Sequence, residues 1–100
     1  MTQEEARARL DELRVLIDEI DGRMVRLLNE RTLVVESIGR VKREAALPVY
    51  EPKREDLVFA NVAQSNQGPM TQEALRGIFE RIIDEMRKIQ RMRMASQGDQ

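Results

Sequence analysis

Apolar residues recur at alternating gaps of three and four along residues 10–41, the spacing of a helix that packs against another helix. The positions are Leu10, Leu13, Ile17, Ile20, Met24 and Leu27, followed by Val34, Ile38 and Val41. Arg31 occupies the seam position between these two groups, and no proline interrupts the segment. The pattern therefore predicts one long helix with an arginine set into its apolar seam.

Two further helices follow in the pattern. Pro48 disfavours helix in the residues before it, so residues 45–51 are predicted to be a loop. Pro52 is placed to open a short helix over residues 52–64, with Leu57, Val58 and Val62 buried. After a polar loop at residues 65–69, Thr71 can cap a third helix that keeps its apolar period to about Met94.

The fold class predicted is all-α, with a long N-terminal helix, a short helix and a medium one. The chain has 100 residues, of which 41% are hydrophobic, 35% charged and only 3% aromatic. This composition favours one helical domain over residues 1–100 and argues against a sandwich or barrel. We expect residues 1–9 to fray and residues 95–100 to form a disordered tail.

The residue inventory limits the chemistry and the partners. The chain contains no cysteine and no histidine, so thiolate nucleophiles, imidazole bases and the usual zinc sites are excluded, and we expect no metal and no cofactor. A net charge of -1 does not indicate nucleic-acid binding. No signal peptide and no apolar run of about 18 residues is present, which predicts a cytoplasmic protein without a membrane partner.

The length of the first helix predicts a second chain. A helix over residues 2–44 would measure roughly 60 Å at ~1.5 Å per residue, whereas a compact domain of this size has a radius of gyration near ~13 Å. Such a helix extends beyond its own globule. Only a partner chain can cover its seam along the whole length, so we expect an intertwined homodimer.

Charged residues mark a candidate site. Arg31 and Lys42 lie eleven residues apart and so return to within about 20° of the same helix face. Taken alone, Lys42 and Arg14 are typical of solvated or snorkelling side chains, whereas Arg31 needs an anionic partner because its neighbours in the seam are apolar. The amide of Gln90, at the margin of the third helix's apolar face, also needs a partner.

Taken in order, these residues form recognisable motifs. They are Leu13-Arg14-x-x-Ile17-Asp18, Leu27-Leu28-Asn29-Glu30-Arg31, Ile38-Gly39-x-x-Lys42, Pro48-Val49-Tyr50-Glu51-Pro52-x-Arg54-Glu55, and the third helix with Ile78-Phe79-x-x-Ile82-Ile83 and then Gln90. The set closely resembles the all-helical class of chorismate mutases, over about residues 10–92. Any single motif would be common, but the ordered set of Arg, Arg, Lys, Arg-Glu and Gln is specific.

The resemblance implies an intertwined dimer with shared active sites that converts chorismate to prephenate, toward phenylalanine and tyrosine. It implies that Arg14 reaches into the partner's site and that Arg31 binds a carboxylate within its own subunit. Lys42 and Gln90 would donate to the ether oxygen. Glu55 would hold the ring hydroxyl with help from the backbone at Glu51, and Arg54 would support the carboxylate end.

One position departs from the family. Some members have a serine near the ring carboxylate where this chain has Met86, so Met86 is left out of the expected site. The missing His and Cys are no obstacle, because a Claisen rearrangement needs neither proton transfer nor a covalent intermediate. Restraint of a flexible dianion and donors aimed at the ether oxygen are sufficient.

Other interpretations remain open. The chain could be a mutase-like regulatory domain of the first aromatic-pathway enzyme, and a fused or associated pathway enzyme is a candidate partner. A related lyase acting on isochorismate is another enzymatic alternative. A non-catalytic coiled-coil module is a third, although it would not need Arg31 inside its seam.

Overall fold

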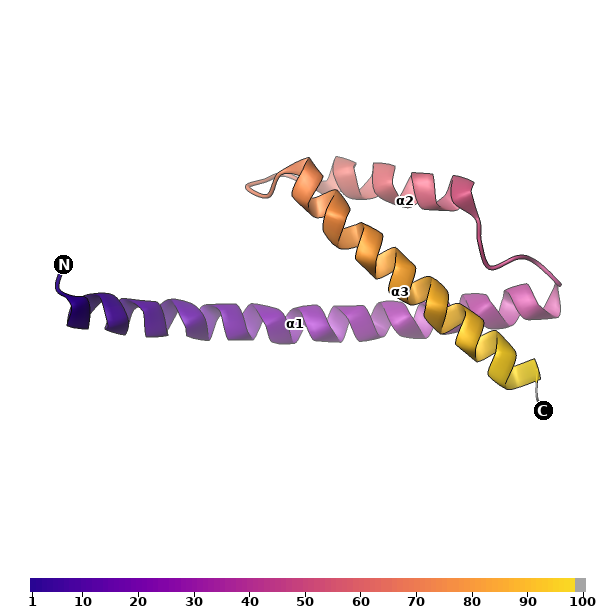
Figure 1. Cartoon of the computed structure of the whole chain (residues 1–100), viewed down its shortest axis with the longest axis horizontal. Helices are drawn as coiled ribbons and strands as arrows, with labels where there is room; N and C mark the ends of the chain where they lie inside the picture. The colour runs from indigo at the N-terminus through magenta and orange to yellow at the C-terminus, as the bar shows by residue number, and fades with distance from the viewer. Residues whose placement is uncertain (99–100) are drawn as a thin grey trace. The chain divides into compact units, whose positions relative to one another are not determined.

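Three helices and no strand make up residues 1–98, the part of the chain that the computed structural model describes (Figure 1). They are α1 (Gln3–Glu44), α2 (Pro52–Ser65) and α3 (Gln72–Gly98). The prediction of an all-α fold is confirmed. None of these helices is long and apolar enough to cross a membrane.

The helix ends lie close to the predicted ones, with two differences at C-terminal ends. The helix α1 (Gln3–Glu44) agrees with the helix expected over residues 2–44, and the Thr2 hydroxyl caps its first turn by accepting a hydrogen bond from the Glu5 N–H at 3.0 Å. The helix α2 ends at Ser65, one residue later than predicted. The helix α3 runs to Gly98, beyond Met94, while the last two residues of the predicted tail lie outside the described residues.

The chain divides into two compact units, residues 1–33 and residues 34–100. The first unit is the N-terminal three-quarters of α1. Its seam residues are exposed within the chain: Leu10 is 44% exposed, Ile17 55%, Met24 50% and Leu27 62%. No residue of this unit is buried in the single chain.

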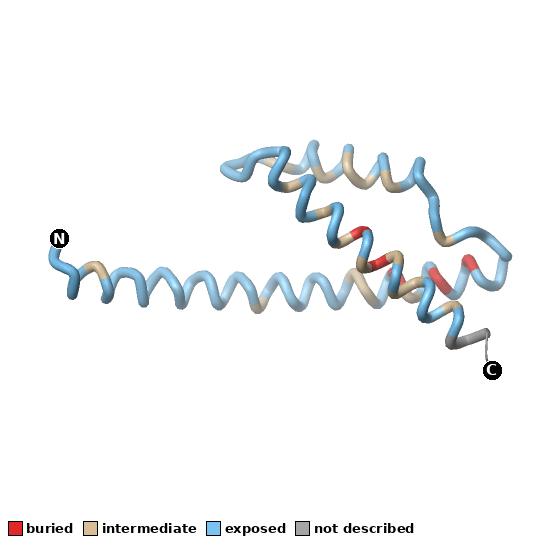
Figure 2. Tube along the Cα trace, in the orientation of Figure 1, coloured by how far each residue is buried: buried red, intermediate tan, exposed pale blue. Residues whose placement is uncertain are grey.

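The second unit contains the end of α1 together with α2 and α3. Its buried residues are Val35, Gly39, Lys42, Ile83 and Met86, and Figure 2 shows the buried positions in red on α3 and on the last part of α1. Gly39 lies where α3 crosses α1, since a Cβ built there would lie 3.8 Å from the backbone of Gln90, an ordinary van der Waals distance. Met86 is therefore a core residue. None of the three α2 residues predicted to be buried is buried in the single chain: Leu57 is 56% exposed, and Val58 and Val62 are half-buried.

A tight C-terminal cap reverses the chain after α1. The Leu47 N–H donates to the Lys42 carbonyl at 2.7 Å and the Ala46 N–H donates to the Arg43 carbonyl at 3.2 Å. This pair of bonds is a Schellman motif, which places one residue in the left-handed region. That residue is Ala46, with φ of 56°. The cap turns residues 47–51 back toward the last turn of α1.

We predict that Ala46→Gly stabilises the protein by about 1 kcal/mol, because glycine adopts a positive φ without the steric cost that a Cβ meets there. The matched control is Ala60→Gly, on the exposed side of α2, which should destabilise the protein by about 1 kcal/mol through helix propensity alone. Urea unfolding measures both changes. Equal destabilisation by the two variants would contradict this description of the cap.

Candidate active site

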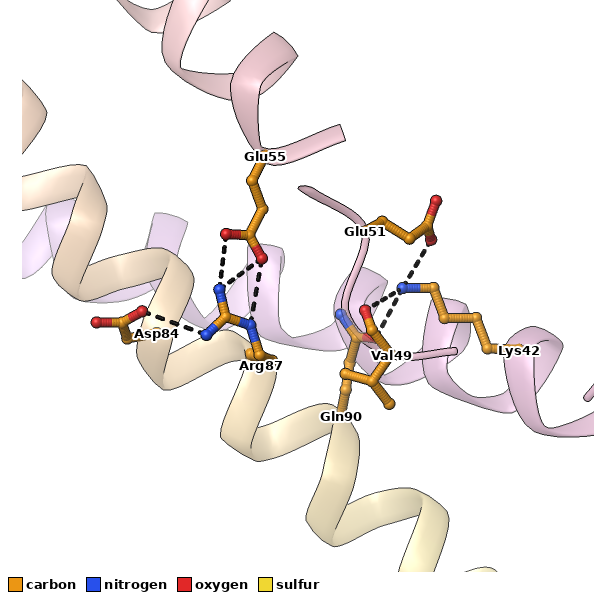
Figure 3. A network of polar contacts seen from close by, with 7 residues as sticks. All are labelled: Lys42, Val49, Glu51, Glu55, Asp84, Arg87 and Gln90. Atoms are coloured by element: carbon orange, nitrogen blue, oxygen red, sulfur yellow. Dashed lines mark hydrogen bonds and ion pairs between the residues drawn. The ribbon is translucent and has the colours of Figure 1, made fainter. Parts of the chain in front are cut away.

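The Lys42 ammonium lies at the centre of the candidate site. Lys42 is only 7% exposed, which contradicts the solvated or snorkelling interpretation of this residue. Its Nζ donates to the Val49 carbonyl at 2.9 Å and to Gln90 Oε1 at 3.2 Å, and lies 2.9 Å from Glu51 Oε1 (Figure 3). An ammonium has three N–H donors, so these acceptors satisfy it.

Two parts of the second unit place these three acceptors. Gln90 comes from α3 and lies against Gly39, one turn before Lys42 on the same face of α1. Val49 and Glu51 come from the loop that the α1 cap turns back. Pro52 at the first position of α2 fixes the end of this loop, because a proline pre-sets the helical φ.

The contact with Lys42 orients the Gln90 amide. Because its oxygen accepts from the ammonium at 3.2 Å, its NH₂ group is the end that can donate to another molecule. An ammonium and an amide NH₂ therefore lie side by side. Such a pair can stabilise negative charge that develops on one oxygen atom.

A second ion pair holds Glu55. Its carboxylate accepts from Arg87 of α3 in a bidentate arrangement, with Nη2 2.6 Å from Oε1 and Nε 3.2 Å from Oε2 (Figure 3). The hydrogen bond to Glu55 is the largest cause of a raised pKa of the Arg87 guanidinium. Arg87 thus stays charged wherever the protein is folded at ordinary pH.

Sequence reasoning missed Arg87. The sequence feature that could have identified it is its position four residues after Ile83 and three before Gln90, which places it on the inward face of α3. Nothing local identified its partner, since Glu55 lies 32 residues earlier in the chain.

The structure brings together four of the predicted site residues: Lys42 with Glu51 and Gln90, and Glu55 one helical turn after Glu51. Arg54 is exposed in the first turn of α2 and takes part in neither of the two ion pairs. Arg14 and Arg31 belong to the first unit. Arg14 is exposed, with Nη1 3.7 Å from Asp11 Oδ1, and Arg31 is half-buried. In residues 1–98 no three His, Cys, Asp or Glu side chains gather to hold a metal ion.

The second unit is helical and combines a buried ammonium with a neighbouring amide, two groups that can stabilise negative charge on an oxygen atom without imidazole or thiol chemistry. The protein family described as chorismate mutase type II matches residues 13–91 of this chain. The chain belongs to this family, and the resemblance seen in the sequence is confirmed.

Particular relatives support the assignment. The chain is 42% identical over 78 residues to a bifunctional chorismate mutase/prephenate dehydratase of Aquifex aeolicus, a match that covers 74% of this chain and 22% of that protein. The chain thus spans only about a fifth of the length of its bifunctional relatives.

Solved structures match over nearly their full length. A chorismate mutase of Thermus thermophilus has a TM-score of 0.81 at 35% identity, covering 83% of this chain and 94% of that one. The chorismate mutase of Helicobacter pylori in complex with prephenate has a TM-score of 0.81 at 28% identity, covering 88% and 96% of the two chains.

We predict that Lys42→Met lowers the free energy of unfolding by about 1–3 kcal/mol, since it leaves the Val49 carbonyl and the Gln90 amide oxygen without their donor. Lys88→Met is the matched control, because the Lys88 ammonium is in an exposed pair with Glu85 at 3.3 Å. This control should change stability by less than about 0.5 kcal/mol. A Lys42→Met protein as stable as the wild type would contradict the stabilising role of the network.

Proposed function

We propose that this chain is a chorismate mutase that converts chorismate to prephenate in the synthesis of phenylalanine and tyrosine. The observation that supports this most strongly is the Lys42–Gln90 pair, in which a buried ammonium holds the oxygen of an amide at 3.2 Å. Both side chains are donors, and both occupy positions that the family motif assigns to the ether oxygen of the substrate.

The proposed reaction needs only donors and restraint. In the rearrangement the ether C–O bond breaks while a C–C bond forms, and electron density builds on the departing oxygen. Lys42 and Gln90 stabilise that charge in a site where their donors are already oriented. Arg31 and Arg14 bind the two carboxylates, because a guanidinium pairs with a carboxylate through two parallel hydrogen bonds. Holding the dianion in its compact conformation removes much of the entropic barrier.

The remaining roles follow the same correspondence. Glu55 accepts from the ring hydroxyl, with help from the backbone at Glu51, and Arg54 supports the carboxylate end. All three Lys42 donors are already occupied. A substrate oxygen can therefore accept a hydrogen bond from Lys42 only by replacing one of the present acceptors. The Glu51 carboxylate is the most easily exchanged one, since its side chain is 49% exposed and water can solvate it after it leaves.

We propose further that two copies form an intertwined dimer with shared sites. The exposed seam of the first unit supports this, because a row of half-exposed Leu, Ile and Met side chains gains stability when a second helix covers it. Arg14, exposed on the same helix, then reaches the site of the partner.

Two finer points stay predictions. The name of the bifunctional relatives pairs chorismate mutase with prephenate dehydratase, and this favours a fused or associated aromatic-pathway enzyme as a partner of our chain. A cytoplasmic location stays a prediction from the sequence. One assay separates the isochorismate lyase and the non-catalytic coiled-coil module from a mutase, and the mutase-like regulatory domain stays an alternative.

That assay follows the ultraviolet absorbance of chorismate on addition of the purified chain, with prephenate identified as the product. We expect loss of chorismate with stoichiometric prephenate. The same measurement with isochorismate as the substrate tests the lyase, which would release pyruvate from isochorismate without turnover of chorismate. No turnover of either compound would contradict an enzymatic function.

A mixing experiment tests the shared site. Arg14→Ala and Arg31→Ala chains should each be nearly inactive, because each lacks one carboxylate partner. After unfolding and refolding together, half of the dimers contain one chain of each kind and one intact site, so about a quarter of the wild-type activity should return. Sedimentation equilibrium should give about twice the chain mass of 11.6 kDa. A folded monomer, or no recovery on mixing, would contradict the shared site.

A third experiment tests the role of Gln90 through the pH dependence of activity. In Gln90→Glu a carboxylate faces the developing negative charge, so kcat/KM should be low near pH 7 and rise as the pH falls toward about 5, where protonation restores a neutral donor. Lys42 beside the new carboxylate favours its charged form, which places the recovery at the acidic end of this range. The wild-type rate should be nearly flat over the same range. A variant with full activity and a flat profile would show that Gln90 does not face the ether oxygen.

A further inference from the structure

Arg87 is the most firmly held charged side chain that the proposed reaction leaves without a role. Its Nη2 lies 2.6 Å and 2.5 Å from the two Glu55 oxygens, and its Nε lies 3.2 Å from Oε2. The two side chains are 23% and 24% exposed. The pair therefore joins α3 to the first turn of α2 at a partly desolvated position, where a bidentate pair is stronger and better oriented than one on the surface.

Other contacts fix Arg87 itself. Its Nη1 lies 3.5 Å from Asp84 Oδ1, one turn earlier on α3. On another side, its guanidinium carbon lies 5.1 Å from the centre of the Tyr50 ring, within the range of a cation–π contact. Arg87 thus contacts Tyr50, whose neighbours in the loop, Val49 and Glu51, bind Lys42. Figure 3 draws Lys42 with these two neighbours. The two cations hold the same loop from two elements of the fold.

The remaining arginine pairs described on α3 differ from this one. Arg76–Glu80 and Arg81–Glu85 are pairs within the helix, and the arginines are 57% and 74% exposed, so they contribute little. Arg93 pairs with Glu36 of α1, a contact between helices that involves none of the proposed site residues. Only the Arg87 pair among these acts on a residue with a proposed role in binding substrate.

We propose that Arg87 is a positioning residue that fixes the Glu55 carboxylate in one orientation as the acceptor for the substrate's ring hydroxyl. This rests on the proposed function, from which the role of Glu55 comes. Each carboxylate oxygen has two lone pairs, so Glu55 can accept from a hydroxyl while both oxygens stay bound to the guanidinium. Without Arg87, a glutamate in a first helical turn samples several rotamers, and only some of them face the substrate.

The test is a double-mutant cycle on kcat/KM for chorismate. Arg87→Ala should lower kcat/KM about 10- to 100-fold, the size of effect that a misplaced contact has. Arg87→Lys should recover part of this, because lysine keeps the charge but lacks the guanidinium fork. In a Glu55→Ala background, Arg87→Ala should change kcat/KM by less than about twofold, because Arg87 acts through Glu55.

Arg93→Ala is the matched control, since it also removes an ion pair between helices. Its kcat/KM should stay within about twofold of the wild type at a temperature where all the variants are folded. If Arg87→Ala does not fold, the cycle is run with Arg87→Lys.

Three outcomes separate the proposals. Losses by Arg87→Ala and Glu55→Ala that multiply would overturn the positioning role and indicate a purely structural one. Wild-type activity in a folded Arg87 variant would also overturn it, while the mutase function stands. A wild-type chain that does not convert chorismate would instead contradict the proposed function itself.

Discussion

The structure of the second unit depends on satisfying one buried ammonium. Removing a lysine from water costs several kcal/mol unless its charge is paired and its donors are bound, and Lys42 is 7% exposed. Three different acceptors meet this requirement: a loop carbonyl, a carboxylate and an amide from α3. Each can reach Lys42 only if α1 ends where it does, the loop turns back and α3 crosses at Gly39. The requirement for charge compensation thus specifies the arrangement of the unit.

The same arrangement makes Lys42 suitable for chemistry. An ammonium held by acceptors that differ in exposure can exchange the most exposed one for a ligand while the others keep it in place. The Val49 carbonyl is a fixed acceptor, whereas the Glu51 side chain is half-exposed. Preorganised donors of this kind need little rearrangement when charge develops on a bound molecule. In the same way, Arg87 holds the Glu55 carboxylate, the proposed acceptor of the site. Residues of α3 thus support both the donor Lys42 and the acceptor Glu55.

Much of the fold could be predicted from local sequence. The apolar period gave three helices, and Pro52 and Thr71 marked two of their starts, with the Thr71 hydroxyl accepting from the Ala74 N–H at 3.1 Å. The rest depends on tertiary contacts. Lys42 looks like a solvated residue near a helix end until Gln90 and the loop cover it, and the pairing of Arg87 with Glu55 spans 32 residues. Leu57 has an apolar side chain at a helical position, yet it is 56% exposed in the single chain.

The central claim is that the Lys42 ammonium is held in place and passes one donor to the substrate, and its NMR signal tests this directly. The chain has three lysines, Lys42, Lys53 and Lys88, so ¹⁵Nζ-lysine labelling gives three ammonium signals, and a Lys42→Arg variant assigns the one of interest. We predict that the Lys42 signal alone exchanges slowly with water and that it shifts when prephenate is added, while Lys53 and Lys88 do not change. A Lys42 signal that exchanges as fast as the others, or that stays fixed in protein saturated with prephenate, would contradict the account.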